Sequence, residues 1–92
     1  MKIEEIRKEL DKIDNKLLDL LSIRLAYCKN IAQYKISNNM KIIQPEREKQ
    51  ILAEKKLIAK NKNLSQEFVE KLFNNIFKES KRIQKEEIEK TK

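Results

Sequence analysis

Glycine and histidine are absent from this 92-residue sequence, and cysteine and proline each occur once. Without glycine, the glycine-rich loops that bind phosphates and dinucleotides are excluded. Without histidine, the sequence lacks the usual base of serine and cysteine nucleophiles and a common zinc ligand. The single cysteine, Cys28, excludes an intrachain disulfide and is expected to be a buried, unreactive thiol. We therefore expect neither a metal nor a cofactor.

Long apolar runs are missing as well. No signal-like apolar segment opens the chain, and no apolar run is long enough to span a bilayer. We expect a cytoplasmic protein with no membrane partner. Charged residues make up 40% of the chain and hydrophobic residues 39%, a balance that favours amphipathic helices over a deep core. The length predicts a single domain, residues 1–92.

The first third of the chain carries an apolar seam at the spacing of one long helix. Along it, an apolar or aromatic residue recurs at every third or fourth position, with one exception. The seam positions are Ile3, Ile6, Leu10, Ile13, Leu17, Leu20, Arg24, Tyr27, Ile31 and Tyr34. A helix over about residues 3–36 would be about 50 Å long. The remaining residues cannot cover such a rod, so part of the seam is expected to pack on a second copy of the chain.

Two shorter helices are predicted after the first. The polar residues 37–39 form a break, because asparagine tolerates a left-handed backbone. Pro45 suits the first position of a helix over about 45–60, and Ser65 is a predicted N-cap for a helix over about 65–88. The expected inner faces contain Ile51, Leu52, Lys55 and Ile58 in one helix and Val69, Leu72, Phe73, Ile76, Phe77 and Ile83 in the other. No strand pattern is convincing, and the predicted fold class is all-α.

Four polar residues lie on or near these apolar faces: Arg24, Lys35, Ser80 and Gln84. A buried guanidinium is costly unless an anion meets it, and that anion is either a carboxylate on a neighbouring helix or a ligand. Arg24 and Lys35 share one helix face about 16 Å apart, which leaves room for a small anion. Ser80 and Gln84 are either part of that site or a polar pair satisfied within a helix contact.

Arginine is scarce in a chain rich in lysine. The net charge is +7, and of the 22 basic residues 18 are lysine. In such a chain, an arginine suggests a site that needs the planar guanidinium group, which can bind a carboxylate through two parallel hydrogen bonds. Arg7 lies about 25 Å from Arg24 along the helix. The two side chains can therefore bind one small molecule only if they come from different subunits of an antiparallel dimer. Otherwise Arg7 is a solvated surface residue. Arg47 and Glu48 are, by default, exposed charges at a helix start.

Taken together, these residues resemble a known family. Arg7, the segment 13–21 (IDNKLLDLL) and Arg24 are similar to the first helix of the all-helical chorismate mutases. The pattern continues at the family's spacing with Lys35, the segment 45–48 (PERE), Ser80 and Gln84. The resemblance implies a three-helix protomer that intertwines as a six-helix homodimer with two identical sites. It also implies an isomerase that converts chorismate to prephenate in the shikimate pathway, on the way to phenylalanine and tyrosine.

The resemblance also assigns the residues that hold the substrate. Arg7 of the partner subunit and Arg24 would bind the two carboxylates of chorismate, and Arg47 would support the carboxylate end. The implied Claisen rearrangement is unimolecular, so the protein has only to select the compact conformer and stabilise charge on the breaking ether bond.

The remaining assignments concern the ether oxygen and the ring hydroxyl. Lys35 and Gln84 would donate to the ether oxygen from opposite sides, and Lys35 would also reach a carboxylate. Glu48 would accept from the ring hydroxyl, and Ser80 would add a polar contact. Gln44 stands where the family often has aspartate, so recognition of the hydroxyl is in question unless the backbone makes that contact.

Three rival functions remain open. Isochorismate-pyruvate lyase shares the fold and much of the site. A basic helical dimer that binds nucleic acid would need lysines on one stripe, whereas the lysines here are scattered among 15 acidic residues; no nucleic-acid partner is therefore expected. A purely structural coiled coil would leave Arg24 without a role.

Overall fold

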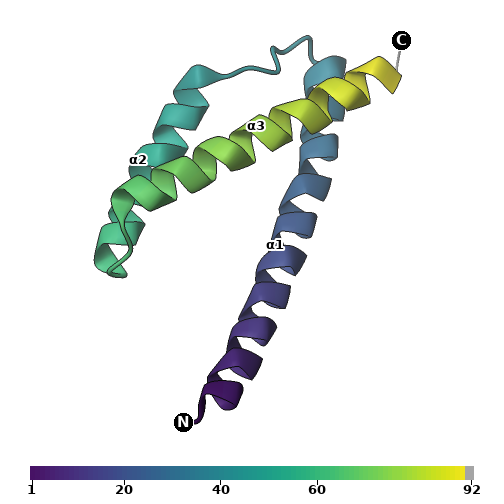
Figure 1. The fold of residues 1–92 in the computed structure, drawn as a ribbon. Coiled ribbons are helices and arrows are strands. Elements are labelled where there is room, and N and C mark those ends of the chain that lie inside the picture. The colour runs from purple at the N-terminus through teal and green to yellow at the C-terminus, as the bar shows by residue number, and fades with distance from the viewer. Residues whose placement is uncertain (91–92) are drawn as a thin grey trace.

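The computed structural model describes residues 1–90 and consists of three helices. They are α1 (Ile3–Ser37), α2 (Pro45–Asn61) and α3 (Gln66–Lys90), shown in Figure 1. The part of the chain that is described contains no strand, so the all-α prediction is confirmed. None of its helices is long and apolar enough to cross a membrane.

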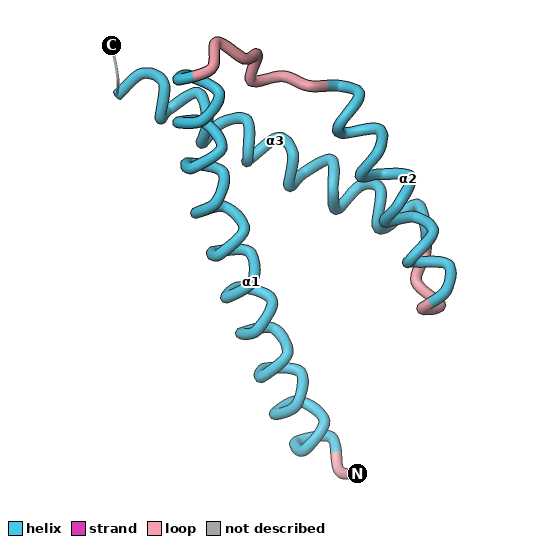
Figure 2. Tube along the Cα trace, turned by 180° about the vertical axis from the view of Figure 1, so that it is seen from behind, coloured by secondary structure: helices cyan, strands magenta, loops and turns pink. Residues whose placement is uncertain are grey.

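Helix α3 joins the other two. It packs against both α1 and α2, while α1 and α2 make no close backbone contact with each other within residues 1–90. Figure 1 shows the N-terminal half of α3 running beside α2 and its C-terminal half crossing the C-terminal end of α1. Figure 2 shows the N-terminal part of α1 extending away from both. Helix α1 therefore packs on the rest of the protomer only through its C-terminal half, where α3 crosses it.

The ends of the helices follow local signals. Asn39 (φ 54°) and Asn63 (φ 58°) adopt the left-handed conformation just after α1 and α2, which asparagine tolerates better than most residues. Pro45 begins α2. The Ser65 hydroxyl accepts a hydrogen bond from the Phe68 backbone N–H at 3.2 Å, which caps α3.

The protomer has a small core. Its buried apolar side chains are Cys28, Ala32, Ala59, Val69 and Phe77. Ile58 and Leu72, which were expected on inner faces, stay 43% and 41% exposed, because neither α1 nor the chain connections cover them in one protomer. The protein is correspondingly elongated, with extents of 55 × 26 × 15 Å and a radius of gyration of 16.5 Å, against about 12 Å for a compact chain of this length.

The apolar seam of α1 stays uncovered in the single chain. Its apolar and aromatic members, from Ile3 to Tyr34, are 39% to 64% exposed. Isolated apolar side chains on a surface are ordinary, but a continuous stripe of this length is typical of an interaction surface. One protomer thus leaves its longest apolar face without a packing partner among the described residues.

Candidate functional site

A cavity of about 720 Å³ lies between the C-terminal half of α1, the start of α2 and the C-terminal half of α3. Its volume is in the range typical of small-molecule sites. Seven of the eight side chains predicted for the site line it: Arg24, Lys35, Gln44, Arg47, Glu48, Ser80 and Gln84. The fold therefore brings together residues that lie up to 60 positions apart in the sequence.

Lys35 lines this cavity and is anchored by two hydrogen bonds. It lies in the last turns of α1 and is only 8% exposed. Its ammonium donates to the backbone carbonyl of Ile42 at 2.9 Å and to Oε1 of Gln84 at 3.0 Å. An ammonium has three N–H donors, so one remains for a ligand. Burial lowers the pKa of Lys35 from its ordinary value of 10.5, and electrostatic interactions with Cys28 and Glu48 partly oppose that shift.

A chain of hydrogen bonds orients Gln84. Because the Lys35 ammonium can only donate, Gln84 presents its oxygen to it, and its amide nitrogen donates to the Ser80 hydroxyl at 3.0 Å. Ser80 Oγ lies 2.9 Å from Cys28 Sγ, and the thiol donates to the backbone carbonyl of Arg24 at 3.4 Å. The Ser80 hydroxyl then donates to the sulfur, which keeps every group paired. The Gln84 amide is fixed, with its second N–H available to a ligand.

Cys28 belongs to the site, although the sequence analysis assigned it no role there. Its burial was predicted correctly, since the side chain is 4% exposed, but it also lines the cavity and contacts Ser80. The spacing contains a signal for this: Cys28 follows Arg24 by four positions and precedes Lys35 by seven, so all three share one face of α1.

The start of α2 forms the opposite wall of the cavity. Glu48 is half-buried and lies 3.3 Å from the ammonium of Lys81 on α3. Arg47 is exposed and donates to Gln50 Oε1 at 2.9 Å. The Gln44 amide donates to the backbone carbonyl of Lys41 at 3.3 Å. Lys81 was not among the predicted site residues, because nothing in its spacing distinguishes it from the other lysines.

The cavity is strongly positive. Its lining holds four cations and one carboxylate: Arg24, Lys35, Arg47, Lys81 and Glu48. Such an excess of positive charge beside apolar side chains suits a small dianion that carries a polar group for the carboxylate to bind. Among residues 1–90, no group of three or more acidic or cysteine side chains is placed to hold a metal ion.

Arg7 does not join this cavity. It is exposed on the N-terminal part of α1, the part that extends away from the other helices in Figure 1. The family resemblance implies that Arg7 lies in the site of a second subunit, and that assignment stays a prediction.

Comparison with known proteins identifies the family. Residues 6–85 match the family described as chorismate mutase type II. The chain belongs to this family. It is 36% identical over 90 residues to a chorismate mutase of Methanocaldococcus jannaschii, and the alignment covers 98% of this chain and 91% of that relative. The resemblance noted in the sequence is confirmed.

Two further relatives show how the family varies. A bifunctional chorismate mutase/prephenate dehydratase of Buchnera aphidicola is 39% identical over 84 residues, covering 91% of this chain but only 22% of the relative. A 4-amino-4-deoxychorismate mutase of Streptomyces pristinaespiralis is 30% identical over 84 residues, covering 91% of this chain and 65% of the relative. Family members thus differ in overall length and in the ring substituent that their names specify.

Proposed function

We propose that this protein is a chorismate mutase that converts chorismate to prephenate within the cavity between its helices. The observation that carries the proposal is the gathering of Arg24, Lys35, Glu48 and Gln84 around one positive cavity, in a chain that belongs to the chorismate mutase family.

The reaction suits this set of side chains. In a Claisen rearrangement an ether C–O bond breaks while a C–C bond forms within the same molecule, so no nucleophile, base or second reactant takes part. Catalysis then consists of holding the reactive conformer and stabilising the negative charge that grows on the ether oxygen. A site made of fixed cations and amides supplies both.

The hydrogen bonds support the roles that we propose for Lys35 and Gln84. Lys35 and Gln84 are each held by other groups and each keeps one N–H, and we assign those two N–H groups to the ether oxygen. Arg24 binds one substrate carboxylate, and Arg47 leaves its contact with Gln50 to support the carboxylate end. Preorganised donors of this kind need little rearrangement as the reaction proceeds.

The ring end of the substrate is assigned to the start of α2. Glu48 accepts from the ring hydroxyl, and Ser80 adds a polar contact as well as orienting Gln84. The Gln44 side chain is bound to the Lys41 carbonyl. Gln44 binds there through its amide nitrogen, so its oxygen can still accept, but a neutral amide is a weaker acceptor than a carboxylate, and we assign the hydroxyl to Glu48.

The proposal includes a homodimer of single-domain chains. The uncovered seam of α1 supports it, because nine apolar or aromatic side chains on one stripe remain 39% to 64% exposed. An antiparallel partner helix would cover them and would bring its own Arg7 to the cavity, where it binds the second carboxylate. Sedimentation equilibrium tests this directly, and the proposal requires twice the mass of one chain.

Conversion of chorismate tests the function. The purified protein is mixed with chorismate, the loss of ultraviolet absorbance is followed, and prephenate is identified in the product. We expect turnover by the wild type and a kcat lower by about 10²–10³ in Lys35→Met. A folded dimer that leaves chorismate unchanged would refute the proposal. Release of pyruvate from isochorismate with greater efficiency would assign the lyase activity instead.

A further inference from the structure

Lys81 is the one charged group of the cavity lining that the proposed mechanism does not use. It follows Ser80 on α3, and its ammonium lies 3.3 Å from Glu48 Oε2 on α2. The two side chains are 31% and 29% exposed, and both line the cavity. Most other ion pairs among the described residues join neighbours three or four positions apart on one helix.

We propose that Lys81 is a positioning residue that fixes the Glu48 carboxylate and makes the site select a neutral ring hydroxyl over a positively charged ring amine. This inference rests on the proposed function, because it takes Glu48 to face the ring substituent of the substrate.

The geometry gives Lys81 a role in orientation. A carboxylate has two oxygens that accept hydrogen bonds. Lys81 lies beside Oε2 of Glu48, which leaves Oε1 to accept from the substrate. Without Lys81 the carboxylate is free to rotate on the side chain of a half-buried glutamate, and its contact with a hydroxyl weakens. A partly exposed ion pair adds little to the stability of a fold, so the pair's contribution is to the placement of Glu48.

Charge gives Lys81 a role in selectivity. A ring hydroxyl is neutral and needs one acceptor, whereas an amine at the same ring position is protonated at neutral pH. That ammonium would bind Glu48 beside the Lys81 ammonium, in a lining that already holds Arg24, Lys35 and Arg47. Binding sites commonly gain specificity from charged groups that repel the wrong ligand. Loss of Lys81 removes the nearest like charge and leaves Glu48 open to the cationic group.

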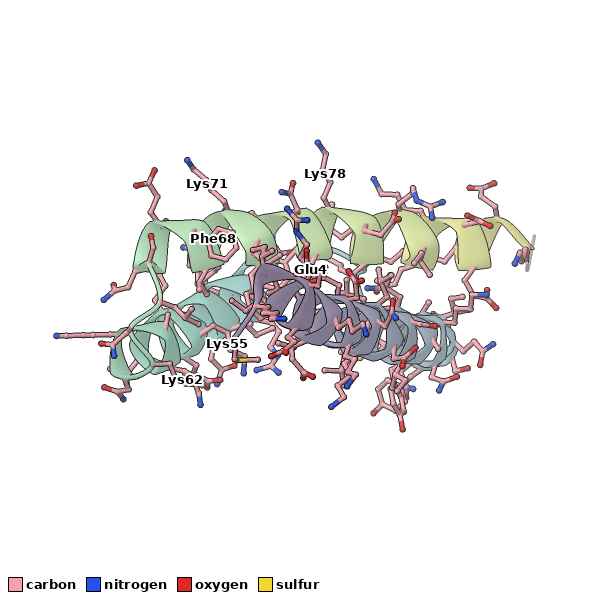
Figure 3. The ribbon with its side chains drawn as sticks, turned by 60° about the horizontal axis from the view of Figure 1, so that its bottom comes forward. Glu4, Lys55, Lys62, Phe68, Lys71 and Lys78 are labelled. Atoms are coloured by element: carbon pink, nitrogen blue, oxygen red, sulfur yellow. The ribbon has the colours of Figure 1, made fainter. Side chains whose placement is uncertain are left out.

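The experiment compares four proteins on two substrates. Wild type, Lys81→Met, Lys81→Arg and Lys78→Met are assayed for kcat/KM with chorismate and with its analogue that carries an amine in place of the ring hydroxyl. Lys78 is the matched control: it lies one turn before Lys81, is exposed and points away from the other helices in Figure 3. Each methionine variant loses one positive charge, so the comparison separates position from net charge.

We expect Lys81→Met to shift the ratio of the two kcat/KM values at least about tenfold towards the amine, which is about 1.4 kcal/mol. Lys81→Arg should retain the wild-type ratio, and Lys78→Met should match the wild type. An equal loss on both substrates, or no change on either, would overturn the role of Lys81 and leave the proposed function intact. A wild-type protein that converts neither substrate refutes the proposed function and this inference with it.

Discussion

Replacement of Lys35 by methionine should separate catalysis from folding. The substitution keeps an unbranched apolar stem of similar length and removes the ammonium that we assign to the ether oxygen. Removing one preorganised donor to a developing oxyanion lowers kcat by about 10²–10³, or about 2.7–4 kcal/mol in the barrier. Because the donor is charged, we expect a loss at the upper end of this range.

The same substitution should change stability much less. It leaves the Ile42 carbonyl and Gln84 Oε1 without the donor that binds them at 2.9 and 3.0 Å, and an unsatisfied acceptor costs about 1–3 kcal/mol. It also relieves the desolvation of a buried ammonium, which is the main cause of the lowered pKa of Lys35. These two effects oppose each other, so the free energy of unfolding should change by about 1 kcal/mol.

Two measurements on the same samples test this reasoning. Chorismate absorbance gives kcat, and thermal unfolding followed by circular dichroism gives stability. A thousandfold lower kcat with a nearly unchanged Tm supports the assignment. A loss of activity below tenfold, or a loss of helicity in proportion to the loss of activity, would refute it and would identify Lys35 as a structural residue.

Three further predictions follow from the hydrogen bonds and charges of the cavity. Because burial lowers the pKa of Lys35, kcat should fall as pH rises through a value below 10.5, and a plateau that persists to 10.5 would contradict this. Between the pKa of Lys35 in the folded protein and 10.5, the unfolded chain binds more protons than the folded one. Over that pH range, the free energy of unfolding of the wild type should therefore rise with pH relative to that of Lys35→Met. Wild-type activity should be flat between about pH 6 and 8, because the Gln84 amide does not titrate. Gln84→Glu should instead lose activity as pH rises, since its carboxyl must be protonated to donate and Lys35 favours the ionised form; a flat profile for that variant would argue against donation by residue 84. Cys28→Ala should lower kcat several-fold, about 1 kcal/mol for one lost hydrogen bond to Ser80, and Cys28→Ser should restore it; wild-type kcat in the alanine variant would show that the thiol does not orient the site.

The secondary structure was predictable because its signals are local. Pro45, Asn39 and Ser65 act within one or two turns, and the helices they delimit begin and end within two residues of the predicted bounds. The exposure of Ile58 and Leu72 was not predictable in the same way. Amphipathic spacing identifies an apolar face, but it does not say whether the same chain or a second copy covers it.

The residues of the site were predictable only in part. Arg24, Lys35, Ser80 and Gln84 stood out because polar groups on or near apolar faces need an explanation, and the family resemblance supplied Gln44, Arg47 and Glu48. Cys28 gave only its spacing on the face of α1 that carries Arg24 and Lys35, and Lys81 gave no such signal. Their contacts with Ser80 and Glu48 join residues 52 and 33 positions apart, and these contacts depend on how α3 lies across the other two helices.

Complementation between inactive subunits tests the claim that each site is assembled from two chains. Arg7→Ala and Arg24→Ala are assayed separately and after they are unfolded and refolded together, with heterodimers counted by native mass spectrometry. Each variant alone should be inactive, while the mixture should regain about one quarter of wild-type activity, because about half of the dimers carry one variant of each kind and one of their two sites is intact. A mixture that contains heterodimers yet stays as inactive as its components, or an Arg7→Ala protein with full activity, would contradict the claim.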